Sequence, residues 1–221
     1  MACGAEPHDP DAVFCDRCLP LLVPFAVPLC PSCALPAPCG GCSAQPWEAA
    51  GAAVPHGPEG SALAVAFKRS GVRRMARLMA GQMAAADSLP GIAANTAVVA
   101  VPPDPRRRRI SGVDHAGLLA GALARELGRP VARPLLRKAA PRGVRQAGAS
   151  RSSRLVAGRI EIHCRSRPAR SCLIVDDVHT TGATLRATAE ALRAGGAQRV
   201  ACMTWARALD PGTSGRKAAS W

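Results

Sequence analysis

The feature that most constrains this fold is the segment SCLIVDDVHTTGATLRATAEALRAGG, which begins at residue 171. Its apolar start, SCLIV, predicts a short buried strand, DDVHTTG predicts a loop, and the remainder predicts a helix with one apolar face. A strand joined to a helix by a tight loop is the repeating unit of α/β sheets. Asp176 and Asp177 stand where the strand is expected to end, and two carboxylates beside a protein core need a reason to be there.

The residues alone leave two interpretations of this loop open. In the first, Thr180 or Thr181 N-caps the helix and the aspartates lie in a solvated turn. In the second, threonine hydroxyls and backbone N–H groups at the helix N-terminus bind a phosphate, and Gly182 lets the anion approach the chain. Vicinal ribose hydroxyls donate to carboxylates, so a ribose 5-phosphate would satisfy both the aspartates and the loop.

The body of the chain alternates strand and helix patterns, which predicts an α/β fold with an open, mainly parallel sheet. Ligands of such sheets bind at the carboxyl ends of the strands, where the paired aspartates are expected. PPDPRRRRISG is interpreted as a loop of prolines and arginines, and residues 137–154 as a long basic lid or disordered loop. Further strands are expected over 96–102 and 199–207, and helices over 72–86 and 113–127, the latter with Asp114 and His115 in its first turn.

The first part of the chain is rich in cysteine. Six of its seven cysteines form C-x-x-C pairs, and two such pairs provide the four sulfurs that zinc binds in a tetrahedron. Cys30, Cys33, Cys39 and Cys42 supply a complete set, and the earlier pair could exchange with either of these pairs. A second ion would need a further ligand, such as His8. The candidate metal ligands are therefore Cys3, Cys15, Cys18, Cys30, Cys33, Cys39 and Cys42.

The segments differ in composition and charge. Residues 1–50 carry a net charge of −4, whereas the rest of the chain carries 28 basic and 10 acidic residues, a net of +18. A basic body favours polyanions, phosphorylated small molecules or nucleic acid. No stretch is long and apolar enough for a membrane span or a secretion signal, so the cytoplasm is the expected compartment. The expected organisation is a cysteine-rich zinc module over 1–45, a Pro/Gly/Ala-rich linker over 46–60, an α/β domain over 61–207 and a disordered tail over 208–221.

VDDVHTTGATL resembles the phosphoribosyl-pyrophosphate loop of the type I phosphoribosyltransferases, because apolar residues, paired acids and T-T-G-x-T occur in that order. From about residue 3 to 207, the chain is similar to the ComF (competence protein F, GntX-like) family, in which an N-terminal zinc module precedes this fold. The resemblance also covers AVVAVPPDPRRRRISGVDHAGLLAGALARELG and the basic element RQAGASRSSR.

The resemblance implies a role for each matched residue. Asp176 and Asp177 would bind the ribose hydroxyls and stabilise the transition state, and Mg²⁺ would accompany phosphoribosyl pyrophosphate (PRPP). Gln146 and Arg154 would belong to a mobile catalytic loop. The 5′-phosphate would be bound by Val178, His179, Thr180, Thr181, Gly182, Ala183 and Thr184, and the pyrophosphate by Val101, Pro102, Pro103, Asp104 and Pro105.

Two functions follow from this resemblance. In one, the protein binds PRPP or a nucleotide and transfers the phosphoribosyl group with release of pyrophosphate, with a family link to competence and DNA uptake. In the other, it is a non-catalytic accessory of DNA uptake that binds nucleic acid and a helicase partner. Few aromatic residues are present to stack on bases, which weighs against direct base contact.

Overall fold

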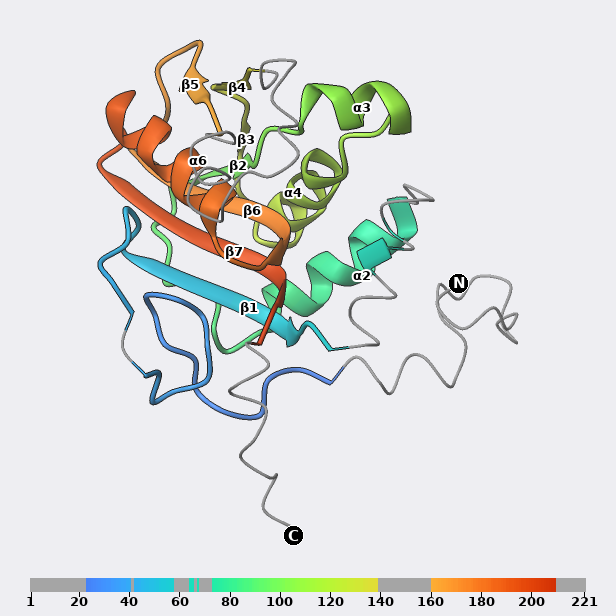
Figure 1. The fold of residues 1–221 in the computed structure, drawn as a ribbon, viewed down its shortest axis with the longest axis vertical. Helices are drawn as coiled ribbons and strands as arrows, with labels where there is room; N and C mark the ends of the chain where they lie inside the picture. The colour runs from blue at the N-terminus through green and yellow to red at the C-terminus, as the bar shows by residue number, and fades with distance from the viewer. Residues whose placement is uncertain are drawn as a thin grey trace, which may run out of the picture.

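A five-stranded parallel sheet forms the centre of the molecule (Figure 1). The structure is a computed structural model that describes residues 23–40, 42–57, 64–65, 67, 73–138 and 160–209. The strand order is β1-β7-β6-β2-β3, and every neighbouring pair is parallel. The strands are β1 (Ala49–Pro55), β2 (Ala97–Ala100), β3 (Val131–Ala132), β6 (Ser171–His179) and β7 (Arg199–Arg207). The predicted α/β fold with an open parallel sheet is thus confirmed.

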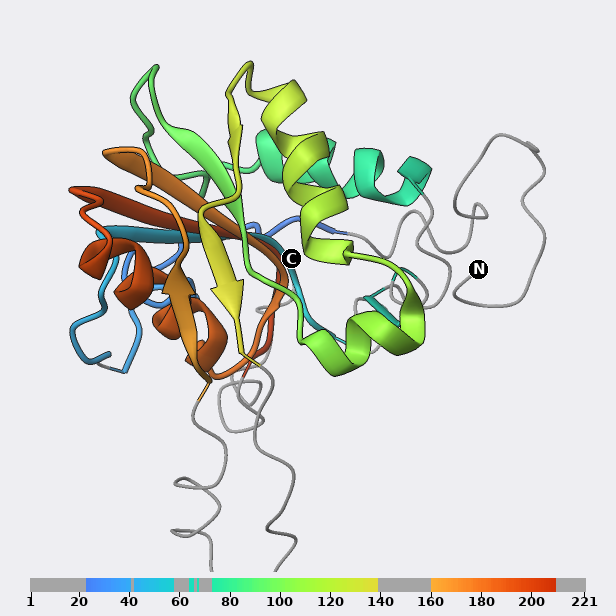
Figure 2. The same cartoon turned by 90° about the horizontal axis from the view of Figure 1, so that it is seen from above.

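Helices cover both faces of the sheet (Figure 2). α2 (Arg73–Ala84) and α4 (His115–Glu126) pack on one face, and α6 (Ala183–Ala194) packs on the other. Side chains of β6 alternate accordingly: Leu173 and Val175 face α2 and α4, whereas Cys172 and Ile174 face α6. A strand covered on both faces needs an uninterrupted apolar run, which explains the sequence SCLIV.

The predicted helix over 72–86 is confirmed as α2. Met75, Met79 and Met83 recur at intervals of one helical turn and are buried against the sheet. The same core contains Trp205 of β7, whose indole N–H donates to the Gln82 side-chain oxygen at 2.7 Å. A buried indole needs such an acceptor.

β1 lies where the sequence indicates a linker. Residues 49–55 read AAGAAVP and pair with β7 at an edge of the sheet. The linker interpretation therefore does not hold for these residues. Their small side chains carry little strand propensity of their own, and the strand forms because β7 offers an unpaired edge and both sides of β1 become buried.

The cysteine-containing segment packs on the same sheet face as α6. Ala34 and Trp47 belong to the core cluster of that face, and the partly buried Phe25 and Leu29 pack against it. The Trp47 indole N–H donates to the Ser32 carbonyl at 2.8 Å. The predicted boundary between a zinc module and the α/β domain stays a prediction, but described residues on its two sides share one core.

Four short elements were not expected: β3, α3, β4 and β5. α3 (Pro105–Ser111) forms within PPDPRRRRISG, so the loop interpretation is wrong there. The Asp104 side chain N-caps this helix by accepting from the Arg106 N–H at 2.9 Å, and Pro105 occupies the first turn, where its missing N–H costs nothing. β4 (Leu135–Arg137) and β5 (Ile162–Cys164) form a separate antiparallel pair.

In the described part of the chain, every helix is too short or too polar to cross a lipid bilayer.

Candidate functional site

The topology opens a crevice between β2 and β6. These strands are neighbours, but the chain leaves β2, by way of α3, for α4 on one face, and it leaves β6 for α6 on the other face (Figure 2). Their pairing ends at Ala100 and Val175, whereas β6 continues four residues further, to His179. In open parallel sheets, a reversal of this kind at the carboxyl ends of strands is the usual ligand-binding position.

A cavity of about 640 Å³ occupies this crevice. It brings together the predicted ribose-binding acids, part of the predicted phosphate loop and most of the predicted pyrophosphate loop. The lining residues that come from α3, the start of α4 and β4 were not predicted from the sequence as parts of the site. The lining residues are Val101, Pro102, Pro103, Asp104, Arg108, Ile110, Ser111, Val113, His115, Ala116, Arg137, Asp176, Asp177, Val178, Thr180 and Thr184.

Both aspartates belong to strand β6, so the loop predicted over 176–182 is wrong for residues 176–179. The strand continues because β7 pairs with it as far as His179 and Arg207. The Asp177 N–H donates to an Asp176 carboxylate oxygen at 2.9 Å, and the Val178 N–H donates to an Asp177 carboxylate oxygen at 2.9 Å. Asp177 is buried, with only 7% of its surface exposed. The strand and these hydrogen bonds hold both acids in fixed positions on the cavity wall.

Gly182, and neither threonine, is the N-cap of α6, so the interpretation of a threonine cap is wrong. The N-cap glycine has no side chain to cap the helix, and the Ala183 N–H donates to the Thr181 hydroxyl at 3.4 Å. The N–H groups of Thr184 and Leu185 donate to no acceptor within the described ranges. Free donors at a helix N-terminus, where the helix dipole is positive, suit an anion.

We expect Gly182→Ala to destabilise the protein more than Gly128→Ala does. Both glycines have positive φ, +76° and +60°, which costs an alanine about 1 kcal/mol. A Cβ at Gly182 would also lie 2.8 Å from Nε2 of His179, whereas no atom lies within 4 Å at Gly128. Chemical denaturation should therefore show a loss of about 1 kcal/mol for Gly128→Ala and about 2–4 kcal/mol for Gly182→Ala. Equal losses would mean that His179 does not fill this space.

The His179 side chain lies behind the loop and does not line the cavity. The residue is 4% exposed, and its ring meets the Trp47 ring edge-on, with the centroids 6.1 Å apart. Burial, and next the charge of Arg207, lower the pKa of His179 to about 4. The imidazole is therefore neutral at pH 7, and its Nδ1 has no hydrogen-bond partner in the described structure.

The opposite wall of the cavity is basic. Arg108 comes from α3 and Arg137 from β4, and the Arg137 guanidinium lies 3.4 Å from the Asp104 carboxylate. Pro105 faces a second cavity instead of this one. Asp114 N-caps α4 by accepting from the Gly117 N–H at 2.8 Å, and the helix expected over 113–127 is confirmed as α4. The run RRRR beside the predicted pyrophosphate loop was the sequence signal for this wall.

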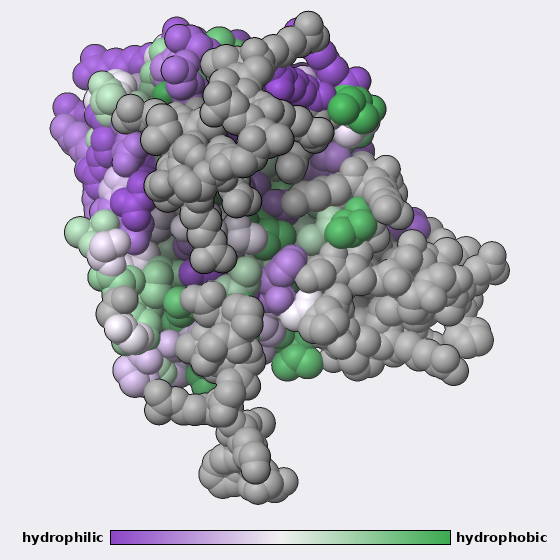
Figure 3. Space-filling model, viewed as in Figure 1, coloured by the Kyte–Doolittle hydropathy of each residue, from purple (hydrophilic) through white to green (hydrophobic). Residues whose placement is uncertain are grey.

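The second cavity, of about 650 Å³, adjoins the first and is richer in arginine. Only one acid, Asp114, lines it. Of the arginines that line this second cavity, only Arg137 forms an ion pair with a described residue. Figure 3 shows that the described surface toward β5 and the end of α6 is mainly hydrophilic. The arginines of this cavity are Arg108, Arg109, Arg133, Arg137 and Arg165.

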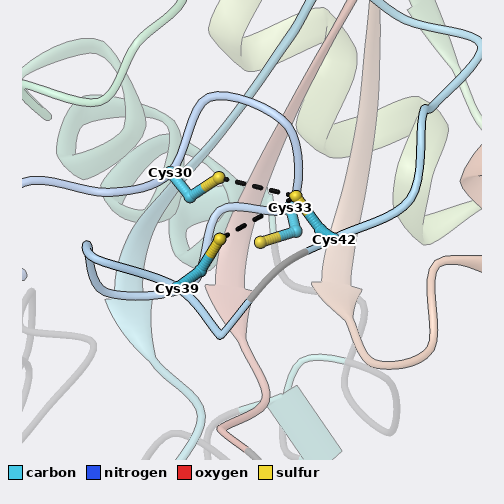
Figure 4. Close-up of side chains that lie close together, drawn as sticks. All are labelled: Cys30, Cys33, Cys39 and Cys42. Carbon is cyan, nitrogen blue, oxygen red and sulfur yellow. Dashed lines mark hydrogen bonds between the residues drawn. The ribbon is translucent and has the colours of Figure 1, made fainter.

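Four cysteines converge at a separate site (Figure 4). The sulfurs of Cys30, Cys33, Cys39 and Cys42 all lie within 4.8 Å of one another. Two of the separations, Cys30 to Cys42 and Cys39 to Cys42, are 3.7 and 3.9 Å. A zinc ion with four sulfurs at about 2.3 Å in a tetrahedron needs sulfurs about 3.8 Å apart. The cluster therefore fits a metal such as zinc, as the C-x-x-C spacing predicts.

Hydrogen bonding prepares this cluster for ionisation. Burial opposes charge on Cys30, but the N–H groups of Ser32 and Cys33 and the neighbouring thiols lower the pKa of the Cys30 thiol to about 6. Burial, helped by Cys30, raises the pKa of Cys33 to about 12. Without a metal, the four-cysteine cluster thus favours one ionised thiol, and a bound cation would stabilise further thiolates in the cluster.

The remaining predicted residues lie outside the described ranges. They are Cys3, Cys15 and Cys18 among the metal ligands, and Gln146 and Arg154 in the predicted mobile loop. Thr181, Gly182 and Ala183 are described but do not line the cavity, and Ala183 is the first residue of α6.

Comparison with known proteins gives one family match. The phosphoribosyl transferase domain model matches residues 110–217. Among solved structures, a glutamine phosphoribosylpyrophosphate (PRPP) amidotransferase from B. subtilis, complexed with ADP and GMP, is 23% identical, with a TM-score of 0.38 over 58% of this chain and 26% of that chain. An allosteric regulatory enzyme of purine biosynthesis is 23% identical, with a TM-score of 0.35 over 58% of this chain and 25% of that one.

The chain spans about a quarter of the length of these two proteins. A search of curated proteins finds no match. The region that matches the family model contains β6, the loop at Gly182 and α6, the elements that form one wall of the cavity. Residues 110–217 are therefore similar to a phosphoribosyl transferase domain, and the chain folds as an open parallel α/β sheet.

Proposed function

We propose that the protein binds PRPP with Mg²⁺ and transfers its phosphoribosyl group to an acceptor, releasing pyrophosphate. One observation carries this proposal: a single cavity places two fixed carboxylates and an uncapped helix N-terminus on one wall, opposite a basic wall. These groups match the three parts of PRPP, which are a ribose with vicinal hydroxyls, a 5′-phosphate and a pyrophosphate.

Each wall has a distinct task in the proposed reaction. Asp176 and Asp177 accept hydrogen bonds from the ribose hydroxyls and orient the sugar. The N-terminus of α6 and the hydroxyl of Thr180 hold the 5′-phosphate. Arg108 and Arg137 neutralise pyrophosphate as it leaves. Fixed charges aimed at the charge that develops in a transition state are worth a few kcal/mol each.

The bond changes balance as a simple displacement. The bond between the ribose anomeric carbon and the pyrophosphate oxygen breaks, and pyrophosphate keeps the electron pair. The acceptor atom forms the new bond to the anomeric carbon. Positive charge grows on the sugar between these events, and the carboxylates of Asp176 and Asp177 stabilise it through space.

The cavity also has the ligands that Mg²⁺ prefers. Oxygen donors are available from the carboxylates of Asp104, Asp176 and Asp177, and Mg²⁺ typically binds one or two carboxylates plus substrate phosphates. When bound, Mg²⁺ would neutralise phosphate charge and orient the pyrophosphate.

Calorimetric titration tests the proposed function. We expect PRPP to bind with Mg²⁺ more tightly than ribose 5-phosphate or pyrophosphate alone, because it engages all three parts of the cavity. Mg²⁺ should strengthen PRPP binding and leave ribose 5-phosphate binding nearly unchanged. Failure of all three ligands to bind at millimolar concentration would refute the proposal.

We further propose that the four described cysteines hold a structural zinc ion, as in the ComF family that the chain resembles. The sulfur separations support this assignment, and the surrounding fold gives the ion a structural task. Cys33 is buried, and Ala34 and Trp47 beside it belong to the core under α6. Zinc would fix the turn that presents these apolar residues to the sheet.

A second candidate function is the handling of nucleic acid during DNA uptake with a helicase partner. The arginine-lined second cavity favours it, because guanidiniums that have no ion-pair partner among the described residues, as in Arg108, Arg109, Arg133 and Arg165, suit phosphates of any polyanion. Replacing Arg133 and Arg165 by glutamine should then weaken single-stranded oligonucleotide binding about 10-fold and lower its salt dependence. The control is a double change of Arg77 and Arg125 to glutamine. These residues are exposed on α2 and α4, and their replacement removes the same amount of charge. Equal effects of the two double changes would show that net charge alone attracts nucleic acid.

A further inference from the structure

Arg207 ends β7 with a buried guanidinium. The residue is only 8% exposed, and full burial of arginine is uncommon because its charge must be compensated. Its Nε–H donates to the Cys33 carbonyl at 2.8 Å. Its Nη1 lies 2.9 Å from the His179 carbonyl and 2.7 Å from the Thr180 carbonyl. The same nitrogen also lies 2.8 Å from the carbonyl of Ala208.

These acceptors belong to two different sites. Cys33 is a member of the cysteine cluster, whereas His179 and Thr180 lead into the N-terminus of α6, where the proposed phosphate site lies. One planar side chain therefore joins the metal-binding turn directly to the phosphate loop. A lysine ammonium could keep the charge, but it lacks the fixed fork that reaches acceptors on both sides at once.

A second contact runs beside the first. The Trp47 indole N–H donates to the Ser32 carbonyl, one residue before Cys33, and the edge of the Trp47 ring meets His179. The His179 ring in turn occupies the space that a side chain at Gly182 would fill. The cysteine turn thus supports both the start of the loop, through Arg207, and its glycine, through Trp47 and His179.

We propose that Arg207 is a positioning residue that couples the cysteine cluster to the phosphate loop, so that metal binding at one site favours phosphate binding at the other. The proposal rests on the proposed function for its ligand. Its energetic meaning is reciprocal: if bound metal tightens phosphate binding, bound phosphate must tighten metal binding by the same factor. Coupling of this kind commonly amounts to about 5–150-fold.

The coupling is measurable with ribose 5-phosphate as the probe. Zinc affinity, measured by competition with a chelator, should rise at least about 5-fold when ribose 5-phosphate saturates the wild-type protein. In Arg207→Lys, the zinc content should remain that of the wild type, but the increase should fall below about 2-fold. The proposal would be overturned if the wild-type protein binds ribose 5-phosphate but its zinc affinity stays the same with and without this ligand.

Arg193→Lys is the matched control. Arg193 of α6 also bonds the N-terminal segment, with its Nε–H donating to the Pro46 carbonyl at 3.2 Å, but it does not touch the phosphate loop. This variant should keep the full coupling. Loss of coupling in Arg193→Lys as well would show that any weakening of the packing between the segments has the same effect, which contradicts a specific role for Arg207.

Hydrogen exchange separates this proposal from the proposed function, because it needs no ligand. In the zinc-loaded wild type, the backbone amides of Arg186 and Ala208 donate to the Gly182 and His179 carbonyls. In zinc-loaded Arg207→Lys, these two amides should exchange at least about 10-fold faster, while amides of α2 remain protected. If this holds but ribose 5-phosphate does not bind, the proposed function is wrong and the positioning role stands. Unchanged exchange at both amides would contradict the positioning role, whatever the ligand.

Discussion

Replacing Asp176 and Asp177 together by asparagine should lower the affinity for PRPP and Mg²⁺ at least about 100-fold. Each carboxylate is expected to accept a charge-assisted hydrogen bond from a ribose hydroxyl, and such bonds contribute about 1.5–3 kcal/mol. Two of them correspond to a factor of roughly 100 or more. Calorimetry of the double variant measures this loss. The fold should persist, because an asparagine oxygen can still accept from the next residue's N–H, as each aspartate does.

The matched control is Glu190→Gln, which removes an acidic charge from an exposed position on α6. Its affinity for PRPP should stay within about twofold of the wild type, because the position lies outside the cavity lining. Each single aspartate variant should fall between the wild type and the double variant. If the PRPP affinity of the double variant stays within about threefold of the wild-type affinity, Asp176 and Asp177 are not part of the PRPP-binding site.

Cys33→Ser should reduce the zinc content and lower the thermal midpoint of unfolding by about 6–12 °C. A ligand that binds the native state at about 100 times its dissociation constant contributes about 3 kcal/mol. A change of 1 kcal/mol shifts the midpoint by roughly 2–4 °C in a chain of this size. Zinc analysis and a thermal scan under reducing conditions measure both effects. Chelation of the wild-type protein should produce a similar shift.

Cys164→Ser is the control for the cysteine substitution. Cys164 lies in β5, away from the cluster, and its thiol donates to the Ala191 carbonyl at 3.3 Å, a bond that serine can replace. This variant should keep its zinc and most of its stability. A wild-type protein that binds less than one zinc per chain, or a Cys33→Ser variant with undiminished zinc, would refute the assignment of the four described ligands.

Local patterns predicted much of the fold correctly. The apolar run before Asp176, the methionine spacing of α2 and the strand at 199–207 each contain enough information within a few residues to specify their element. The cysteine spacing likewise predicted a four-sulfur cluster. Prediction failed for β1, whose small residues have no strand pattern, and for α3, whose prolines and arginines suggest a loop.

The amino-acid sequence by itself determined which chemical groups are available: paired acids before a threonine loop, a run of arginines, and cysteines in pairs. The tertiary structure decided which of them meet. Asp176 and Arg137 line one cavity because β6 extends beyond the end of β2 and the chain continues from these two strands to opposite faces of the sheet. Arg207 reaches both Cys33 and Thr180 because parallel pairing brings the ends of β6 and β7 together. Local patterns cannot encode such contacts, since they join residues far apart in the chain through the register of a sheet.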